Sequence, residues 1–297
     1  MSGTVWAAAS GVGFGAFQTV NRRAVARMDV YVATVVQLAV ALVVLLALVG
    51  MTHDRDRLAS IPLASVGWFL LGGAAHFFVG WTLLNTSQQR LGAARTSPLI
   101  STVPLFGAAI AAATLGELPS GLSWLGIALI TLGAYVVAAE RLLHGAERRA
   151  FAWRDSAFGL GTALAWAVSP IFIRKGLDGF DAPLLGVTIG LAISLAAYGL
   201  VLPFASRLRR ERRALGDAPW LKVAAGVLVA LSTWGRWVAL DGAPVGTVLA
   251  LGLLSVPIVL VLSPLVMGRD VERVNLVVWL GALLVVAGSL LLVVHGR

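Results

Sequence analysis

Two ionisable residues lie inside long apolar stretches of this chain, where a charged side chain is costly. His76 lies within the apolar stretch 62–84, and Arg236 lies about one helical turn before the end of the stretch 220–240. An ionisable group in such a place usually faces a protein interior or a water-filled cavity. Histidine exchanges protons near neutral pH, and the planar guanidinium of arginine holds carboxylates. These two residues therefore suggest proton exchange and the binding of a polar cargo.

Each of the two residues also has a purely structural interpretation. His76 can be a packing histidine that is hydrogen-bonded between helices, and Arg236 can extend its guanidinium to the membrane interface. Asp241 lies just beyond the same apolar stretch as Arg236, where it can pair with that arginine or anchor the helix end. His76 and Asp241 are the candidates for proton coupling, and the alternatives stay open on sequence alone.

Other polar and aromatic residues inside apolar stretches extend the candidate binding site. A serine lies one helical turn before Arg236 and shares its face of the helix. A glutamine follows a glycine-rich helical face, and a second glutamine lies in the next stretch. Two tryptophans lie deep enough for a cavity wall rather than the interfacial belt. The predicted substrate-binding residues are His76, Arg236, Gln18, Gln37, Trp166, Trp237 and Ser232.

Two prolines occupy matched positions within apolar stretches. Pro104 and Pro257 each follow a valine and lie well inside their stretches. Because proline lacks a backbone N–H and obstructs the preceding turn, both helices are expected to kink or break there. In a membrane the freed carbonyls must find partners or line a cavity, so both prolines are predicted to lie in the cavity wall.

Composition places these residues in a membrane. The chain is 59% hydrophobic and 12% charged, with a mean hydropathy of +0.89, whereas soluble domains are about one quarter charged. The net charge of +9 comes from basic residues in short connections, which favours anionic lipid over nucleic acid as the partner. Cysteine is absent, which excludes thiolate chemistry. With no catalytic constellation and no metal-ligand spacing, we expect no enzyme, no cofactor and no metal.

The apolar stretches predict an all-α integral membrane protein with ten transmembrane helices. A bilayer-spanning helix needs about 20 apolar residues. The stretches are 3–20, 30–50, 62–84, 96–115, 121–139, 156–173, 182–202, 220–240, 245–267 and 274–295.

A pattern of residues recurs in the two halves of the chain, shifted by about 152 to 155 positions. The matches include Arg22 with Arg174, Asp29 with Asp181, Glu117 with Glu272, Gly126 with Gly281 and Gly133 with Gly288. We therefore expect a first five-helix repeat at 1–140, a basic connection at 141–155 and a second repeat at 156–297. Because five is odd, the second repeat enters the bilayer from the opposite side, and the repeats are inverted.

The end of each half resembles a known family. Leu115-Gly116-Glu117, Trp124-Leu125-Gly126 and Gly133 form a Gly-Glu turn followed by a glycine-spaced helix, and this is similar to the unit of the EamA-type branch of the drug/metabolite transporter superfamily. The second copy departs from that pattern, with extra residues at 268–272. The resemblance implies two five-helix units and a small-molecule carrier, commonly an exporter.

The leading hypothesis is a secondary active transporter that exports a small polar or amphipathic metabolite by alternating access, with protons as a candidate coupling ion. The alternatives are a flippase for a lipid-linked sugar or amphiphile, and a non-transporting membrane receptor or assembly protein. Most of the 23 basic residues lie in odd-numbered connections, which predicts that these face the cytoplasm and that both termini lie outside. We expect the cytoplasmic membrane of a prokaryote as the location. The sequence leaves the oligomeric state open.

Overall fold

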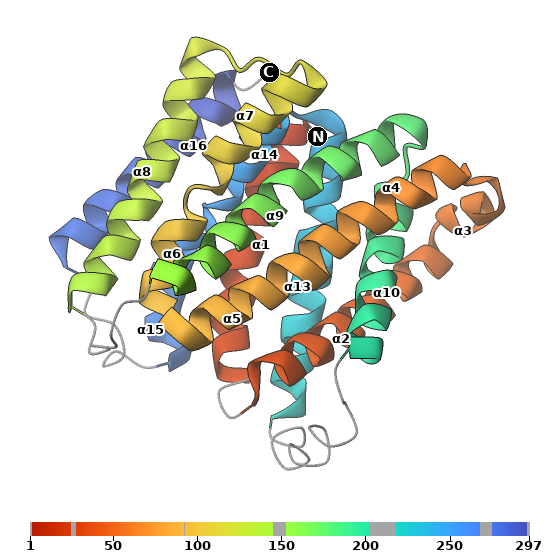
Figure 1. The fold of residues 1–297 in the computed structure, drawn as a ribbon, viewed down its shortest axis with the longest axis horizontal. Helices are drawn as coiled ribbons and strands as arrows, with labels where there is room; N and C mark the ends of the chain where they lie inside the picture. Colours follow the sequence, from red (N-terminus) through yellow and green to blue (C-terminus); the bar gives the residue numbers. More distant parts are fainter. Residues whose placement is uncertain are drawn as a thin grey trace.

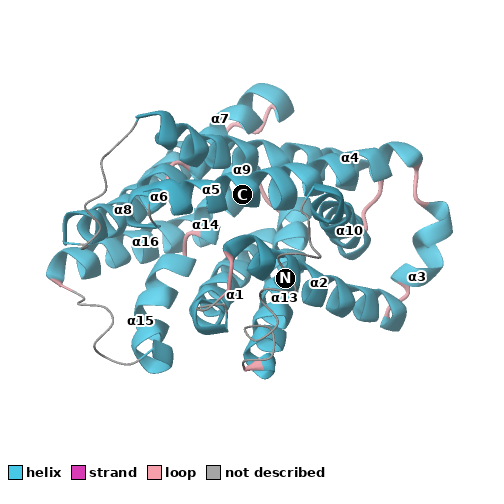
Figure 2. Cartoon of the chain, turned by 60° about the horizontal axis from the view of Figure 1, so that its bottom comes forward, coloured by secondary structure: helices cyan, strands magenta, loops and turns pink. Residues whose placement is uncertain are grey.

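The chain is an all-helical membrane protein. The computed structural model describes residues 2–24, 28–91, 93–144, 153–201, 218–267 and 275–295, and no strand occurs in these ranges (Figure 2). Eight helices among the described residues are long and apolar enough to cross a membrane. This confirms the predicted class of a multi-pass membrane protein.

The helices follow the expected stretches closely. In the first half they are α1 (Gly3–Ala24), α2 (Val30–Met51), α3 (Asp54–Arg57), η1 (Leu58–Ser60), α4 (Leu63–Gly73), η2 (Ala74–Gly80), α5 (Trp81–Leu91), α6 (Ala93–Ile100), α7 (Val103–Leu115) and α8 (Gly121–His144). In the second half they are α9 (Trp153–Gly179), α10 (Pro183–Val201), α13 (Pro219–Gly242), α14 (Val245–Gly252), α15 (Ser255–Met267) and α16 (Leu276–His295).

Two of the ten expected spans are not among the eight candidates. Helix α1 has 22 residues but carries several polar side chains, and the fourth expected span is divided between α6 and α7. The ten-span layout with inverted repeats therefore stays a prediction.

Both proline-bearing stretches are interrupted just before the proline. Pro104 lies in the first turn of α7, after a break at Ser101 and Thr102. Pro257 lies in the first turn of α15, after a break at 253–254. A proline is tolerated in a first helical turn because the N–H that it lacks would have no helical partner there.

Helices from the two halves pack against one another rather than forming two separate bundles. Helix α1 packs on α13, α14 and α15, while α9 packs on α4, η2, α5, α6 and α7. Helix α8 pairs with α16, and α2 lies against α10 and α13 (Figure 1). Both ends of the chain lie at the top of Figure 1.

Glycines allow the closest of these contacts. A Cβ on Gly15 of α1 would lie 2.6 Å from Ile258 of α15, and one on Gly11 would collide with the backbone of Leu251. The glycine-rich face of α1 is therefore a packing surface, as such faces commonly are in membranes.

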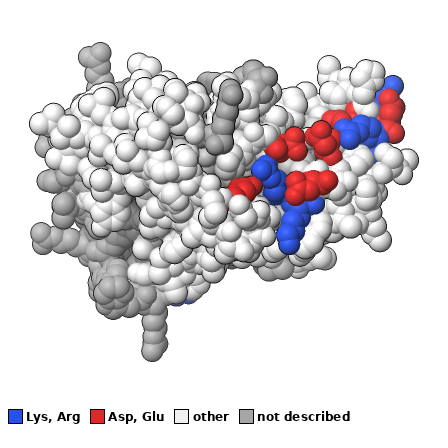
Figure 3. Space-filling model, turned by 90° about the horizontal axis from the view of Figure 1, so that it is seen from above, with Lys and Arg blue, Asp and Glu red and all other residues white. Residues whose placement is uncertain are grey.

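Charged side chains gather in one region of the face that is seen from above in Figure 3. Elsewhere on that face the described residues are largely uncharged. The described ion pairs include Arg57–Asp54 of α3 and Arg174–Glu117. Asp29 is the N-cap of α2, because its Oδ1 accepts from the backbone N–H groups of Tyr31 and Val32.

Candidate functional site

A cavity of about 540 Å³ lies between the two halves of the chain. Its wall combines residues of α1, α2, η2, α5, α6 and α8 with residues of α9, α13, α14 and α15. Met28, in the connection after α1, lines it as well, so the cavity extends toward that end of the bundle. Five predicted residues line it: Gln18, Gln37, His76, Trp166 and Arg236.

His76 is positioned by an unusual segment of backbone. It lies in the π-helix η2, whose wider turns leave carbonyl groups for partners outside the helix. The indole N–H of Trp166 donates to the carbonyl of His76 at 3.2 Å, and the hydroxyl of Tyr198 donates to the carbonyl of Phe77 at 3.3 Å. Side chains of α9 and α10 thus stabilise the segment that presents His76.

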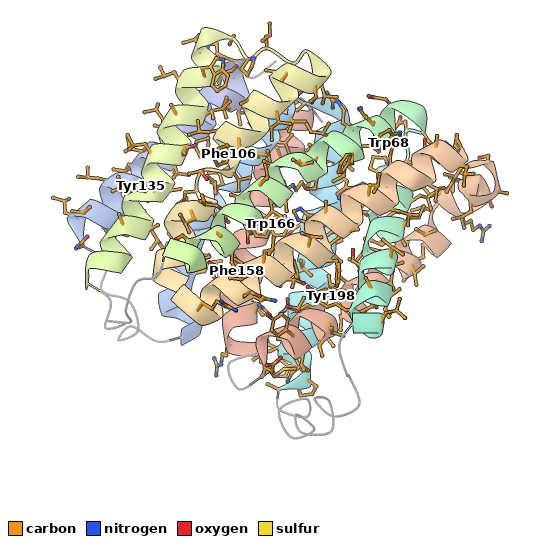
Figure 4. All side chains as sticks on the ribbon, viewed as in Figure 1. Trp68, Phe106, Tyr135, Phe158, Trp166 and Tyr198 are labelled. Atoms are coloured by element: carbon orange, nitrogen blue, oxygen red, sulfur yellow. The ribbon has the colours of Figure 1, made fainter. Side chains whose placement is uncertain are left out.

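The ring of His76 has defined neighbours. Its Nδ1 lies 3.2 Å from Oγ of Ser169, and its ring stacks on Trp166 with centroids 5.5 Å apart. Gly80 leaves the space for this indole, because a Cβ there would lie 2.6 Å from Cδ1 of Trp166. Figure 4 shows Trp166 on α9 near the centre of the bundle. The result is a flat aromatic surface in the cavity wall.

Arg236 faces the cavity from the C-terminal third of α13. It is half-buried, and it makes no hydrogen bond or ion pair within the part of the chain that the structure describes. An unpaired guanidinium is costly inside a membrane protein, and the cost is lower where the group reaches a polar cavity. The geometry therefore disfavours the interpretation in which Arg236 extends to the lipid interface.

Amide side chains surround the part of the cavity nearest to Met28. Nε2 of Gln37 donates to Oδ1 of Asn21 at 2.7 Å, and Nδ2 of Asn85 donates to Oγ1 of Thr34 at 2.9 Å. Gln18 is exposed to the cavity. This part of the cavity is polar, and it can form hydrogen bonds with a cargo.

Asn21 and Asn85 were missed by the sequence analysis. Each lies one residue beyond the expected end of an apolar stretch, and each helix continues past it. A polar residue just past an apolar stretch is a signal that could have found them, since such a residue can extend the helix along a cavity.

Three predicted site residues lie away from the cavity. Trp237 is 1% exposed and packs against Phe69, with ring centroids 5.7 Å apart. Ser232 faces α1, where its backbone carbonyl accepts from the hydroxyl of Ser10 at 2.7 Å. Asp241 lies at the opposite end of the bundle from Met28, beside Arg174 in a surface hollow, and it does not pair with Arg236.

The two matched prolines do not line the cavity either. The residues just before them do: Ser101 and Val103 precede Pro104, and Ser255 and Val256 precede Pro257. The breaks contribute to the wall through these neighbours, because the prolines themselves belong to the first turn of the following helix.

A part-buried ion pair lies at the end of the bundle opposite Met28. Nη2 of Arg174 donates to Oε1 of Glu117 at 2.9 Å, with the side chains 19% and 16% exposed. The other oxygen of Glu117 accepts from the N–H of Val245 at 2.7 Å. Arg174 also donates to the backbone carbonyls of Leu240, Asp241 and Ala243 at the end of α13.

In the described ranges, no three His, Cys, Asp or Glu side chains come close enough together to hold a metal ion. A cavity with polar and apolar walls between helices of both halves is typical of membrane carriers.

Comparison with known proteins agrees with this class. The model of the EamA-like transporter family matches residues 1–139, which confirms the resemblance seen in the sequence and suggests a membrane transporter of the drug/metabolite transporter superfamily. Members of this family are generally not enzymes. A solved structure, described only as a crystal structure of a protein, is 16% identical with a TM-score of 0.66 over 96% of both chains, and this shows a shared fold. No curated protein matches the sequence.

Proposed function

We propose that the protein is a secondary active transporter that moves a small polar or amphipathic metabolite by alternating access. The observation that carries this proposal is a cavity that reaches one end of the bundle while Glu117 and Arg174 close the other end. A carrier must be open to one side and sealed to the other in each of its states. The extension of the cavity toward Met28 and the Glu117–Arg174 pair at the other end support this proposal.

The packing of the helices supports two inverted repeats. Residues 126 and 133 of α8 match 281 and 288 of α16 in the sequence repeat. A Cβ on Gly281 would lie 2.8 Å from the carbonyl oxygen of Gly133, and one on Gly288 would lie 2.7 Å from that of Gly126. Exchange of the two halves converts one glycine pair into the other, as a pseudo-two-fold axis requires.

The charge distribution predicts which side of the membrane the cavity faces. If the odd-numbered connections face the cytoplasm, the cavity extends toward the cytoplasm in this conformation, because Met28 lies in the first connection. A cytoplasm-facing cavity can load a cargo for export. His76 supplies a titratable group at the cavity wall for proton coupling, and the cytoplasmic membrane of a prokaryote is the location that fits this orientation.

Proteoliposomes test the proposal directly. The purified protein should give saturable uptake of a metabolite from a mass-detected mixture, with and without a pH gradient. Ala138 lines the cavity, so Ala138→Trp should abolish the flux by filling it. Leu132 lies on the same helix but is 52% exposed on the outer surface, so Leu132→Trp should transport normally.

The outcomes separate the competing functions. Movement of a fluorescent lipid across the bilayer without flux of soluble metabolites would establish a flippase. If the mixture yields no flux and lipids do not move, a receptor or assembly role replaces the transporter.

A further inference from the structure

We infer that the cavity binds an organic monoanion with an apolar or aromatic body, and that Arg236 holds the anionic group. The transport of such a cargo rests on the proposed function, whereas its binding does not. The inference comes from the charges that face the cavity, the surfaces beside them and the lack of a partner for one cation.

Within the described part of the chain, Arg236 has no counter-ion. No aspartate or glutamate is among the described residues that line the cavity. The nearest acid along α13 is Asp241, and it lies at the closed end beside Arg174. A buried guanidinium is stabilised by a carboxylate that bonds to both of its N–H edges. A ligand is the partner that the cavity can accept.

The same charges discriminate against other classes of cargo. His76 is the other ionisable group in the described wall, and it becomes positive when it is protonated. An organic cation would meet no negative partner there, and the ammonium group of a zwitterion would stay unpaired. Specificity of this kind arises from unpaired charges as much as from favourable contacts. One permanent cation in the described wall fits one negative charge on the cargo.

The other residues of the cavity wall favour a cargo with an apolar or aromatic body. Trp166 presents its ring beside His76, and Phe14, Phe17 and Trp81 add further aromatic surface. Leu249 and Leu253 supply aliphatic surface. Flat rings bind apolar or aromatic groups well, while the amides of Gln18 and Asn21 can bind a polar substituent. A volume of about 540 Å³ lies within the usual range for small-molecule sites.

Matched triplets of probes test the charge preference on purified protein in detergent. Each triplet keeps one body and changes the charge: phenylacetate, phenethylamine and phenylalanine; indole-3-acetate, tryptamine and tryptophan; octanoate, octylamine and 2-aminooctanoate. Isothermal titration should show the carboxylate binding at least about tenfold tighter than its amine and zwitterion in one triplet or more. Failure of all three carboxylates to bind, or equal binding across every triplet, overturns the inference.

Substitution of Arg236 tests which residue holds the anion. Arg236→Lys keeps the charge but loses the planar pair of donors, so carboxylate affinity should fall about tenfold. Arg236→Gln should reduce it to the affinity of the uncharged amide, phenylacetamide in the first triplet. Arg55→Gln is the control, because Arg55 is 65% exposed on α3. Wild-type carboxylate affinity in Arg236→Gln assigns the anion to another group, and Arg236→Lys, which keeps the charge, is the variant that is safer for folding.

The inference about cargo binding and the proposal of transport can be refuted by different results. If the protein binds the carboxylate but proteoliposomes show no flux, the transporter proposal fails and the assignment of the cavity stands. If proteoliposomes transport amines or zwitterions as well as carboxylates, transport stands and the anion preference fails.

Discussion

Glu117 and Arg174 join the two halves of the chain at the closed end of the bundle. The carboxylate of Glu117 accepts from Arg174 at 2.9 Å and from the first N–H of α14, at Val245, at 2.7 Å. Arg174 in turn donates to carbonyls at the end of α13. One ion pair therefore connects the α7–α8 connection, α9 and the α13–α14 connection, and alternating access requires that these contacts separate.

Removal of the charge on Glu117 should weaken this seal. Glu117→Gln keeps the size of the side chain but loses the ion pair, and coupled buried groups are worth about 0.5–3 kcal/mol. A loss of about 1.4 kcal/mol raises the open population tenfold. The chain has no cysteine, so Val245→Cys can report the opening on its own. Val245 is fully buried, and its labelling by a membrane-impermeant maleimide should accelerate about tenfold in the Glu117→Gln background.

A second cysteine controls for general loosening. Gln18 lines the cavity, so Gln18→Cys should react with the maleimide from the opposite side of the membrane in both backgrounds. The Glu117→Gln substitution should not accelerate this labelling. Acceleration at both positions would indicate partial unfolding, and unchanged labelling at Val245→Cys would show that the ion pair does not hold this end closed.

Gly80 should be required for the position of Trp166. A Cβ at residue 80 would lie 2.6 Å from Cδ1 of the indole, so Gly80→Ala must displace the ring that stacks on His76. Overpacking of this kind costs about 1–3 kcal/mol, and we expect a lower melting temperature in detergent together with weaker cargo binding. Gly67 of α4 has no atom within 4 Å of an added Cβ, so Gly67→Ala is the matched control. Equal melting temperatures for the two variants would contradict the close contact.

Hydropathy predicts most of the helices because lipid-facing helices must be apolar. The expected stretch 121–139 begins where α8 begins, and 245–267 has the same limits as α14 and α15 together. Two of the boundary errors lie where helices reach the cavity. Hydropathy predicts that the first and third stretches end at residues 20 and 84, whereas α1 continues to Ala24 and α5 continues to Leu91. Asn21 and Asn85 are tolerated there because their amides have polar neighbours.

The direction of each side chain was harder to predict than the helix that carries it. Arg236 and Trp237 are adjacent on α13, and a helix turns about 100° per residue, so only one of them faces the cavity. Ser232 shares the face of Arg236, but at its level α1 covers α13, with Gly13 against the serine hydroxyl. Helical periodicity fixes relative angles along one helix, whereas the neighbouring helices decide which face is covered.

His76 should carry the pH dependence of transport if protons drive it. Among the described residues, Arg236 of α13 lines the same cavity, Ser169 and Trp166 of α9 contact the ring, and Tyr198 of α10 bonds to the carbonyl of the next residue, Phe77. His76→Gln keeps a hydrogen-bonding side chain that does not titrate. In proteoliposomes, a pH gradient should stimulate wild-type flux, and His76→Gln should lose this stimulation while exchange without a gradient continues.

The control for this prediction is a second described histidine, His53. His53→Gln changes a fully exposed residue before α3 and should keep the response to the gradient. A gradient response that persists in His76→Gln would assign the coupling to another group.

The contact between α8 and α16 should depend equally on its two symmetric glycine pairs. Gly133 and Gly288 occupy matched positions in the repeat, and a Cβ on either would meet the backbone of the facing helix. Gly133→Ala and Gly288→Ala should therefore each destabilise the protein by about 1–3 kcal/mol, measured as loss of thermal stability in detergent. Gly121, at the start of α8, has open space around an added Cβ, and Gly121→Ala should be close to neutral. A large loss from only one of the two matched substitutions would argue against a pseudo-two-fold axis between α8 and α16.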